Sequence, residues 1–94
     1  MSRSKDREYR KWRIKVIRRD KKCILCGSRY RRAAHHVNTW HYFPKERYDV
    51  KNGVCLCGHC HMMYHTKFKS SYRCKGTKKD FIRFAKLATY FRES

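Results

Sequence analysis

The stretch LCGHCHMMYH, residues 56–65, places two cysteines and three histidines within ten positions. Thiolate sulfur and imidazole nitrogen are ligands that zinc and related divalent ions favour. The stretch therefore predicts metal binding, and the question is whether it serves one ion, two ions or none. The answer depends on which residues elsewhere in the chain can supply the remaining ligands.

A second cysteine pair matches the thiols of this stretch. Cys23 and Cys26 form one C-x-x-C pair, and Cys57 and Cys60 form another about thirty residues later. Two such pairs are typical of tetrahedral zinc, whose coordination sphere four thiolates fill completely. We therefore expect a closed, structural zinc site. The alternative is a redox pair or a cluster of packed free thiols.

Two further cysteines fall outside this spacing. Cys55 is expected to be a small buried residue on a strand, and Cys74 a thiol in a linker. A ligand role for Cys55 in place of Cys57 is the alternative, but the C-x-x-C spacing favours Cys57.

Composition explains why a metal would be needed. A chain of 94 residues is expected to form a single domain, residues 1–94, whose core is too small to be very stable without a metal, a disulfide or a partner. The N-terminus has no apolar signal segment, so an intracellular location is predicted. In a reducing compartment, six cysteines indicate metal ligands or free thiols more than disulfides.

The net charge indicates the kind of partner. Lys and Arg number 26 against 7 Asp and Glu, which gives a net charge of +19. The chain is 40% hydrophobic and 15% aromatic, too apolar for a disordered basic tail. A polyanion is therefore expected as partner, and DNA is the first choice. No apolar run is long enough to cross a membrane and no lipidation motif is present, so a membrane partner is not expected.

Hydrophobic periodicity predicts an α+β fold with a central metal-binding core, residues 20–68, between two helices. Tyr9, Trp12 and Val16 recur at helical spacing in the first helix, and Thr77 with Asp80 resembles a capping box before the last. The predicted elements are a helix over 4–19, strands over 32–37 and 53–57, a loop over 38–51, a helix from about residue 60, a polar linker over 69–77 and a helix over 78–92. The apolar face of the last helix is assigned to the core and consists of Phe81, Phe84, Ala85, Ala88 and Phe91.

The histidines suggest a second, open site. His61 and His65 are four residues apart and share one face of a helix, whereas the adjacent His35 and His36 point to opposite faces of a strand. If strand and helix pack together, three imidazoles can bind one ion and leave coordination positions free. Free positions distinguish a catalytic metal site from a structural one.

Taken together, CILCG, AHHV, Asn52 and LCGHCHMMYH resemble the zinc-containing form of the HNH nuclease family, whose motif runs CxxC, HH, N and LCxxCHxxxH. The resemblance covers roughly residues 10–66. It implies a ββα-metal core, in which two antiparallel strands and a helix surround one divalent ion. It also implies a bacterial, cytoplasmic and phage-encoded origin, with a phage packaging protein or another protein as a further partner.

The resemblance assigns roles residue by residue. It implies that His35 and His61 bind the catalytic ion, joined by His65, and that His36 is the general base. Asn52 would fix the loop and help to orient that base. The expected reaction is hydrolysis of a DNA phosphodiester to a 5′-phosphate and a 3′-hydroxyl, with Mg²⁺, Mn²⁺, Ni²⁺, Co²⁺ or Zn²⁺ as the catalytic ion.

Two of these roles have alternatives, and one feature departs from the family pattern. His65 could contact the phosphate directly, and Asn52 could be a turn residue ahead of Gly53. The family usually shows a proline soon after its HH pair, whereas here Pro44 lies further along, which implies a longer or differently shaped loop.

Basic side chains are expected to contact DNA phosphates without reading bases. The aromatic loop residues Trp40, Tyr42 and Phe43 could enter a groove or pack on the core. The rival function is a non-catalytic zinc-ribbon DNA-binding module, and a structural adaptor is a third possibility. The candidate phosphate contacts are Arg29, Arg31, Arg32, Lys67 and Lys69, with Arg13 and Arg18 on the first helix.

Overall fold

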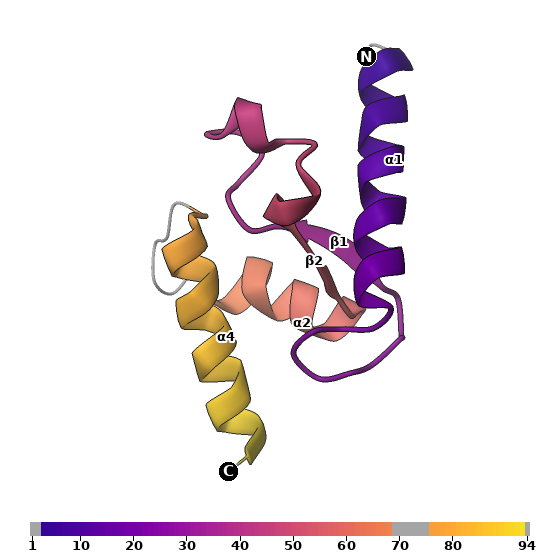
Figure 1. Ribbon diagram of the computed structural model, residues 1–94. Coiled ribbons are helices and arrows are strands. Elements are labelled where there is room, and N and C mark those ends of the chain that lie inside the picture. The colour runs from indigo at the N-terminus through magenta and orange to yellow at the C-terminus, as the bar shows by residue number, and fades with distance from the viewer. Residues whose placement is uncertain (1–2, 69–75, 94) are drawn as a thin grey trace.

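The computed structural model describes residues 3–68 and 76–93, with side chains at positions 7–66, 68 and 76–88 (Figure 1). The predicted Cys74 and Lys69 lie outside these residues, as do the side chains of Lys67 and Phe91. The elements in chain order are α1 (Arg3–Asp20), β1 (Ala33–His36), η1 (Pro44–Glu46), η2 (Val50–Asn52), β2 (Gly53–Leu56), α2 (Gly58–Met62), η3 (Met63–Phe68) and α4 (Lys78–Glu93).

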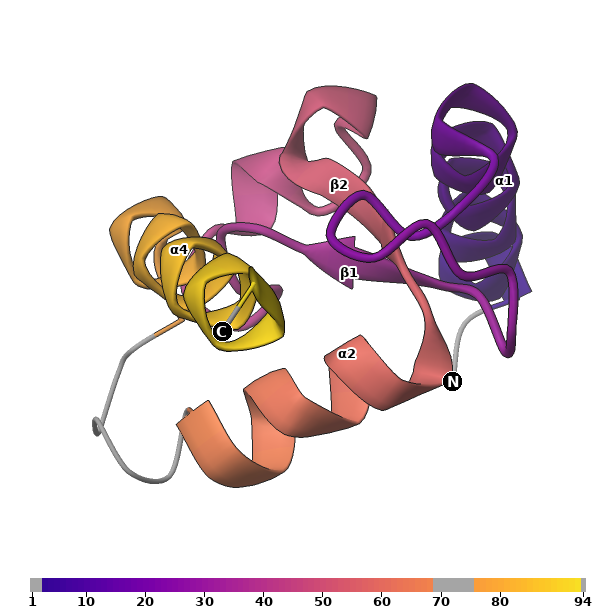
Figure 2. The ribbon, with the colours of Figure 1, turned by 90° about the horizontal axis from the view of Figure 1, so that it is seen from below.

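The two strands form an antiparallel sheet in which Ala33 pairs with Leu56 and His36 pairs with Gly53. The sheet lies between α1 on one side and α2 with α4 on the other (Figures 1 and 2). The predicted α+β class is therefore confirmed. Because successive residues of a strand face opposite ways, β1 contributes to both sides of the sheet.

A buried cluster fills each side of the sheet. On the α1 side, Trp12 and Val16 pack against Ala34 of β1. The other side holds a larger cluster that joins β2 and both C-terminal helical segments, and its members include Leu56, Tyr64, Phe68, Phe81, Phe84 and Ala88. Phe81, Phe84 and Ala88 of the expected core face of α4 are thus buried. In α1, Trp12 and Val16 are buried, whereas Tyr9, at the same helical spacing, is 40% exposed.

Hydrogen bonds explain where the helices begin and end. The Thr77 hydroxyl donates to the Asp80 carboxylate and accepts from the Asp80 backbone N–H, which is the expected capping box at the start of α4. At the end of α1, Asp20 accepts from the backbone N–H of Cys55, and Arg19 donates to the carbonyl oxygens of Val50 and Gly53. This pair of side chains fastens α1 to β2.

Two local predictions need correction. The segment 38–51, expected to be a loop, contains the 3-10 turns η1 and the start of η2, because Pro44 suits the first turn of a helix and the Asp49 carboxylate caps η2 by accepting from Lys51 N–H. The helix expected from about residue 60 begins at Gly58, since the Cys57 sulfur accepts from the Cys60 N–H and caps it.

Among the residues that the structure describes, no helix combines the length and apolar character that crossing a bilayer requires.

Candidate metal centres

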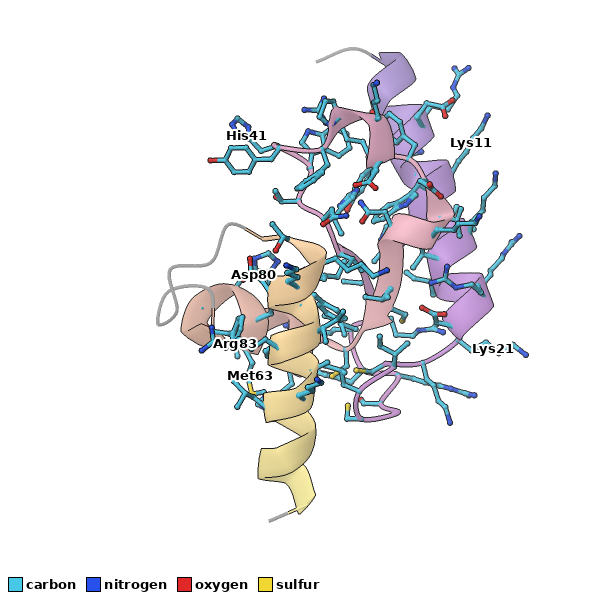
Figure 3. All side chains as sticks on the ribbon, turned by 60° about the vertical axis from the view of Figure 1, so that its left-hand side comes forward. Lys11, Lys21, His41, Met63, Asp80 and Arg83 are labelled. Atoms are coloured by element: carbon cyan, nitrogen blue, oxygen red, sulfur yellow. The ribbon has the colours of Figure 1, made fainter. Side chains whose placement is uncertain are left out.

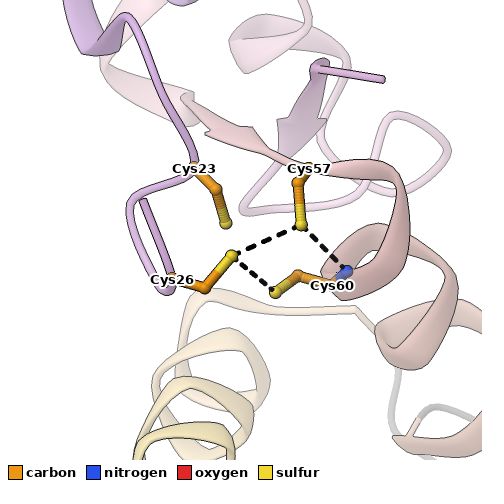
Figure 4. A group of neighbouring side chains, drawn as sticks. All are labelled: Cys23, Cys26, Cys57 and Cys60. Carbon is orange, nitrogen blue, oxygen red and sulfur yellow. Dashed lines mark hydrogen bonds between the residues drawn. The ribbon is translucent and has the colours of Figure 1, made fainter. Parts of the chain in front are cut away.

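The four cysteines with C-x-x-C spacing converge at one point (Figure 4). All four Sγ atoms lie within 4.8 Å of one another, with 3.5 Å between Cys26 and Cys57 and 3.8 Å between Cys26 and Cys60. Zn–S bonds of about 2.3 Å in a tetrahedron place sulfurs about 3.8 Å apart. The thiols are therefore close enough to hold a metal ion, and their spacing is compatible with zinc.

Tight turns position these thiols. Gly27 adopts a left-handed φ of 77° and closes the first turn by donating its N–H to the Cys23 carbonyl at 2.9 Å. The backbone N–H of Ile24 donates to the Cys55 carbonyl, which fixes this turn to β2. Cys55 itself is fully buried, as expected, and the cluster of four thiols does not include it.

The pKa values of the clustered thiols are shifted in different directions. Burial raises the pKa of Cys60, and hydrogen bonding with Cys57 raises it further. Burial also raises the pKa of Cys26. Cys23 differs, because backbone N–H groups outweigh the effect of burial and lower its pKa to about 7. A bound cation would favour the ionised form of all four thiols.

A second group of ligands comes from β1, α2 and η3. The ring nitrogens of His35, His61 and His65 lie within 4.8 Å of one another, and Nε2 of His61 is 3.1 Å from Nε2 of His65. With metal–nitrogen bonds of about 2.1 Å, ligand nitrogens stand about 3.0 Å apart in octahedral and about 3.4 Å apart in tetrahedral geometry. The separation between His61 and His65 falls between these values, and all three imidazoles lie close enough together to hold one metal ion.

Burial differs across this histidine cluster. His35 is 3% exposed and its ring packs on Tyr64 and Phe81, with centroid distances of 4.5 and 5.2 Å. His61 is half-buried, and burial lowers its pKa, which favours the neutral imidazole that binds metal. His65 is exposed. A bound ion would therefore have protein on one side and access from solvent on the other.

His36 lies on the opposite face of β1, toward α1. Its Nε2 is 2.9 Å from the carbonyl oxygen of Arg47. A carbonyl can only accept, so Nε2 carries the proton and Nδ1 keeps a lone pair. Burial lowers the pKa of His36 against the opposing effect of this hydrogen bond, which favours the neutral ring. His36 can thus accept a proton at Nδ1.

One cavity is lined by residues from both faces of β1, at the end of the strand that carries His35 and His36. It has a volume of about 210 Å³, and its lining includes His35, His36, His61 and His65 together with Tyr9 and Trp40. A ligand in this cavity would meet the three clustered imidazoles and the fourth, separate one at the same time.

Asn52 supports the site through the loop. It is 6% exposed; its side-chain oxygen accepts from the Asn38 N–H at 2.7 Å, and its amide donates to the Asn38 and Glu46 carbonyls. The hydrogen-bond partner of His36 is the Arg47 carbonyl, not Asn52. Asn52 is also the last residue of the 3-10 turn η2, directly ahead of Gly53, as the alternative expected, but this turn is not an Asn-Gly hairpin turn, because Gly53 has an extended φ of −125° and begins β2.

The structure describes the side chains of some, but not all, of the predicted phosphate contacts. Arg29, Arg31 and Arg32 are exposed beside the first cysteine turn, although Arg32 donates to the Lys21 carbonyl. Figure 3 shows Lys11 of α1 and Lys21 just after it pointing outward. Among the described side chains of α1, seven basic residues are exposed, namely Arg7, Arg10, Lys11, Arg13, Lys15, Arg18 and Arg19.

The aromatic residues of the loop differ in their exposure, and Trp40 packs inward. Trp40 lies edge-on to His36 at 5.6 Å between centroids, and the Arg47 guanidinium covers its ring at 4.8 Å. Tyr42 is 65% exposed. Two residues near His36 were missed as parts of the site: Trp12 was predicted only as one of the apolar residues at helical spacing in the first helix, and the backbone carbonyl of Arg47 gives no sequence signal.

No family model, curated protein or solved structure matches the chain significantly. The arrangement of its side chains therefore has to carry the functional argument.

Proposed function

We propose that this chain is a metal-dependent DNA endonuclease of the HNH type, with β1, β2 and α2 as its ββα-metal core. The observation that carries the proposal is the cavity shared by His36 and the three clustered imidazoles. A phosphodiester bound there would have a metal site beside it and a proton acceptor within the same cavity.

The proposed roles follow from the chemistry of phosphodiester hydrolysis. His35, His61 and His65 would hold the divalent ion, which when bound neutralises phosphate charge and stabilises the leaving 3′-oxygen. His36 would accept a proton from the attacking water at Nδ1, while its Nε2–H stays on the Arg47 carbonyl. Asn52 would keep the loop that carries this carbonyl in place.

We further propose that the ion held by Cys23, Cys26, Cys57 and Cys60 is structural zinc. Four thiolates leave no free coordination position, so this ion would stabilise the fold without taking part in the reaction. DNA would bind through the net charge of +19, with the exposed arginines beside the first cysteine turn and the basic residues of α1 as phosphate contacts.

The test is a plasmid-cleavage assay with the zinc-loaded protein and each of Mg²⁺, Mn²⁺, Ni²⁺, Co²⁺ and Zn²⁺ in turn. His36→Ala should lower the cleavage rate by about 10²–10⁴-fold, the usual contribution of a general base. His41→Ala is the matched control, because His41 is an exposed histidine on the adjoining loop. Equal rates for both variants would refute the assignment of the base.

The same experiment separates the rival function. The cysteine cluster and the positive charge equally suit a zinc-ribbon module that binds DNA without cutting it. Tight DNA binding with no EDTA-sensitive cleavage by the wild-type protein would favour that module.

A further inference from the structure

Trp12 of α1 lies flat against the imidazole of His36. The two ring centroids are 3.9 Å apart and the planes differ by 11°, a closer and more parallel contact than Tyr9 or Trp40 makes with the same histidine. Trp12 is 1% exposed, so one face of the imidazole is covered by a ring that solvent barely reaches.

The indole is itself held in place by two features. Its Nε1–H donates to the Asp49 carbonyl at 2.8 Å. On the neighbouring strand, Gly53 pairs with His36, and a Cβ built on Gly53 would lie 2.5 Å from Val16 Cγ2 and 2.7 Å from Trp12 Cζ2. A side chain at position 53 would therefore push the indole away, and glycine is what allows the two rings to stack.

The stack and the hydrogen bond constrain different motions of His36. Contact with the indole resists tilting of the imidazole plane, and the bond from Nε2 to the Arg47 carbonyl resists rotation within that plane. Reaction rates depend steeply on such placement, because a misplacement of about 1 Å can cost roughly 10²-fold.

We infer that Trp12 is a positioning residue for His36, holding the imidazole so that Nδ1 stays directed for proton transfer. This inference rests on the proposed function for the role of His36. It assigns to α1, which lies outside the proposed ββα-metal core, a part in the reaction.

The experiment compares Trp12→Leu and Trp12→Phe with Val16→Ala. Val16 is buried on the same face of α1, so its truncation controls for loosened packing of the helix. Under single-turnover conditions, we expect Trp12→Leu to lower the maximal cleavage rate by roughly 10-fold or more with an unchanged DNA concentration at half-saturation. Trp12→Phe, which keeps an aromatic face, should recover most of the rate, and Val16→Ala should keep it.

A second measurement does not depend on DNA cleavage. In NMR spectra of protein with labelled histidine, the His36 ring protons should show the upfield shift expected for stacking on indole, and the Nε2–H tautomer. Trp12→Leu should lose the upfield shift, and Val16→Ala should keep both features. If the wild-type protein fails to cleave DNA but shows this pattern, the proposed function fails and the placement of His36 by Trp12 stands. Equal rates for Trp12→Leu and Val16→Ala, or an unshifted wild-type His36, would overturn the inference.

Discussion

Replacing Gly53 by alanine should separate α1 from the sheet. Two effects compete at this position. Gly53 has an ordinary extended φ of −125°, so alanine there would stabilise the protein by about 0.4–1 kcal/mol through the unfolded chain. Against this, the new Cβ would lie 2.5 Å from Val16 Cγ2 and 2.7 Å from Trp12 Cζ2, and such overpacking costs about 1–3 kcal/mol.

The steric effect should win, because both contacting side chains are buried and neither can turn toward solvent. The middle of each range, a cost of about 2 kcal/mol less a gain of about 0.7 kcal/mol, leaves a net loss of about 1.3 kcal/mol, which lowers the Tm of a domain of this size by about 5–10 °C. Thermal unfolding of zinc-loaded protein, followed by circular dichroism, measures this loss. Adding Val16→Ala should remove the closest contact, so the double variant should be more stable than the sum of the single effects predicts.

A Gly53→Ala variant as stable as the wild type, or more stable, would refute the packing of α1 against His36 and Gly53. The same result would remove the basis for Trp12 as a positioning residue.

The remaining predictions concern the cysteine cluster and the end of α1. Cys57→Ser should lose tightly bound zinc and its folded circular-dichroism signal. Cys55→Ser, a change two residues away on β2, should keep the zinc. Metal analysis after dialysis distinguishes the two variants, and equal zinc loss from both would contradict the choice of ligands. A hydrogen bond from Arg19 lowers the pKa of Asp20, so this carboxylate stabilises the fold above its unfolded pKa of about 3.9, and the contribution disappears as pH falls through the lower folded value. Asp20→Asn should therefore lower the Tm at pH 6 and make it less dependent on pH below about 4, and a parallel decrease in Tm for both proteins would count against this account.

Spacing along the chain was enough to predict the cysteine cluster and the histidine pair on the helix. Two C-x-x-C pairs are the typical ligand set of one tetrahedral zinc ion. The approach of His61 to His65 requires only that one helical turn separates them. Likewise, the start of α4 follows from a local cap between Thr77 and Asp80. Each C-x-x-C pair, the histidine pair and the cap join residues close in sequence, which is why periodicity and spacing predict them, and the shared coordination chemistry of four thiols brings the two cysteine pairs together.

The surroundings of His36 could not be predicted in this way. Its contacts come from α1 and from the segment after η1, which meet only when the chain folds. Trp12 has the pattern of an ordinary core residue, and Gly53 after Asn52 has the pattern of a turn. Only the packed structure shows that the missing side chain of Gly53 makes room for Trp12.

The most direct test of an open metal site beside a closed one is a calorimetric titration of zinc-loaded protein with Mn²⁺ or Ni²⁺. The wild-type chain should bind one further, exchangeable ion, and a His61→Ala/His65→Ala variant should lose that binding while retaining its tightly held zinc. Absence of a second binding event in the wild-type protein, or unchanged binding in the variant, would contradict the account.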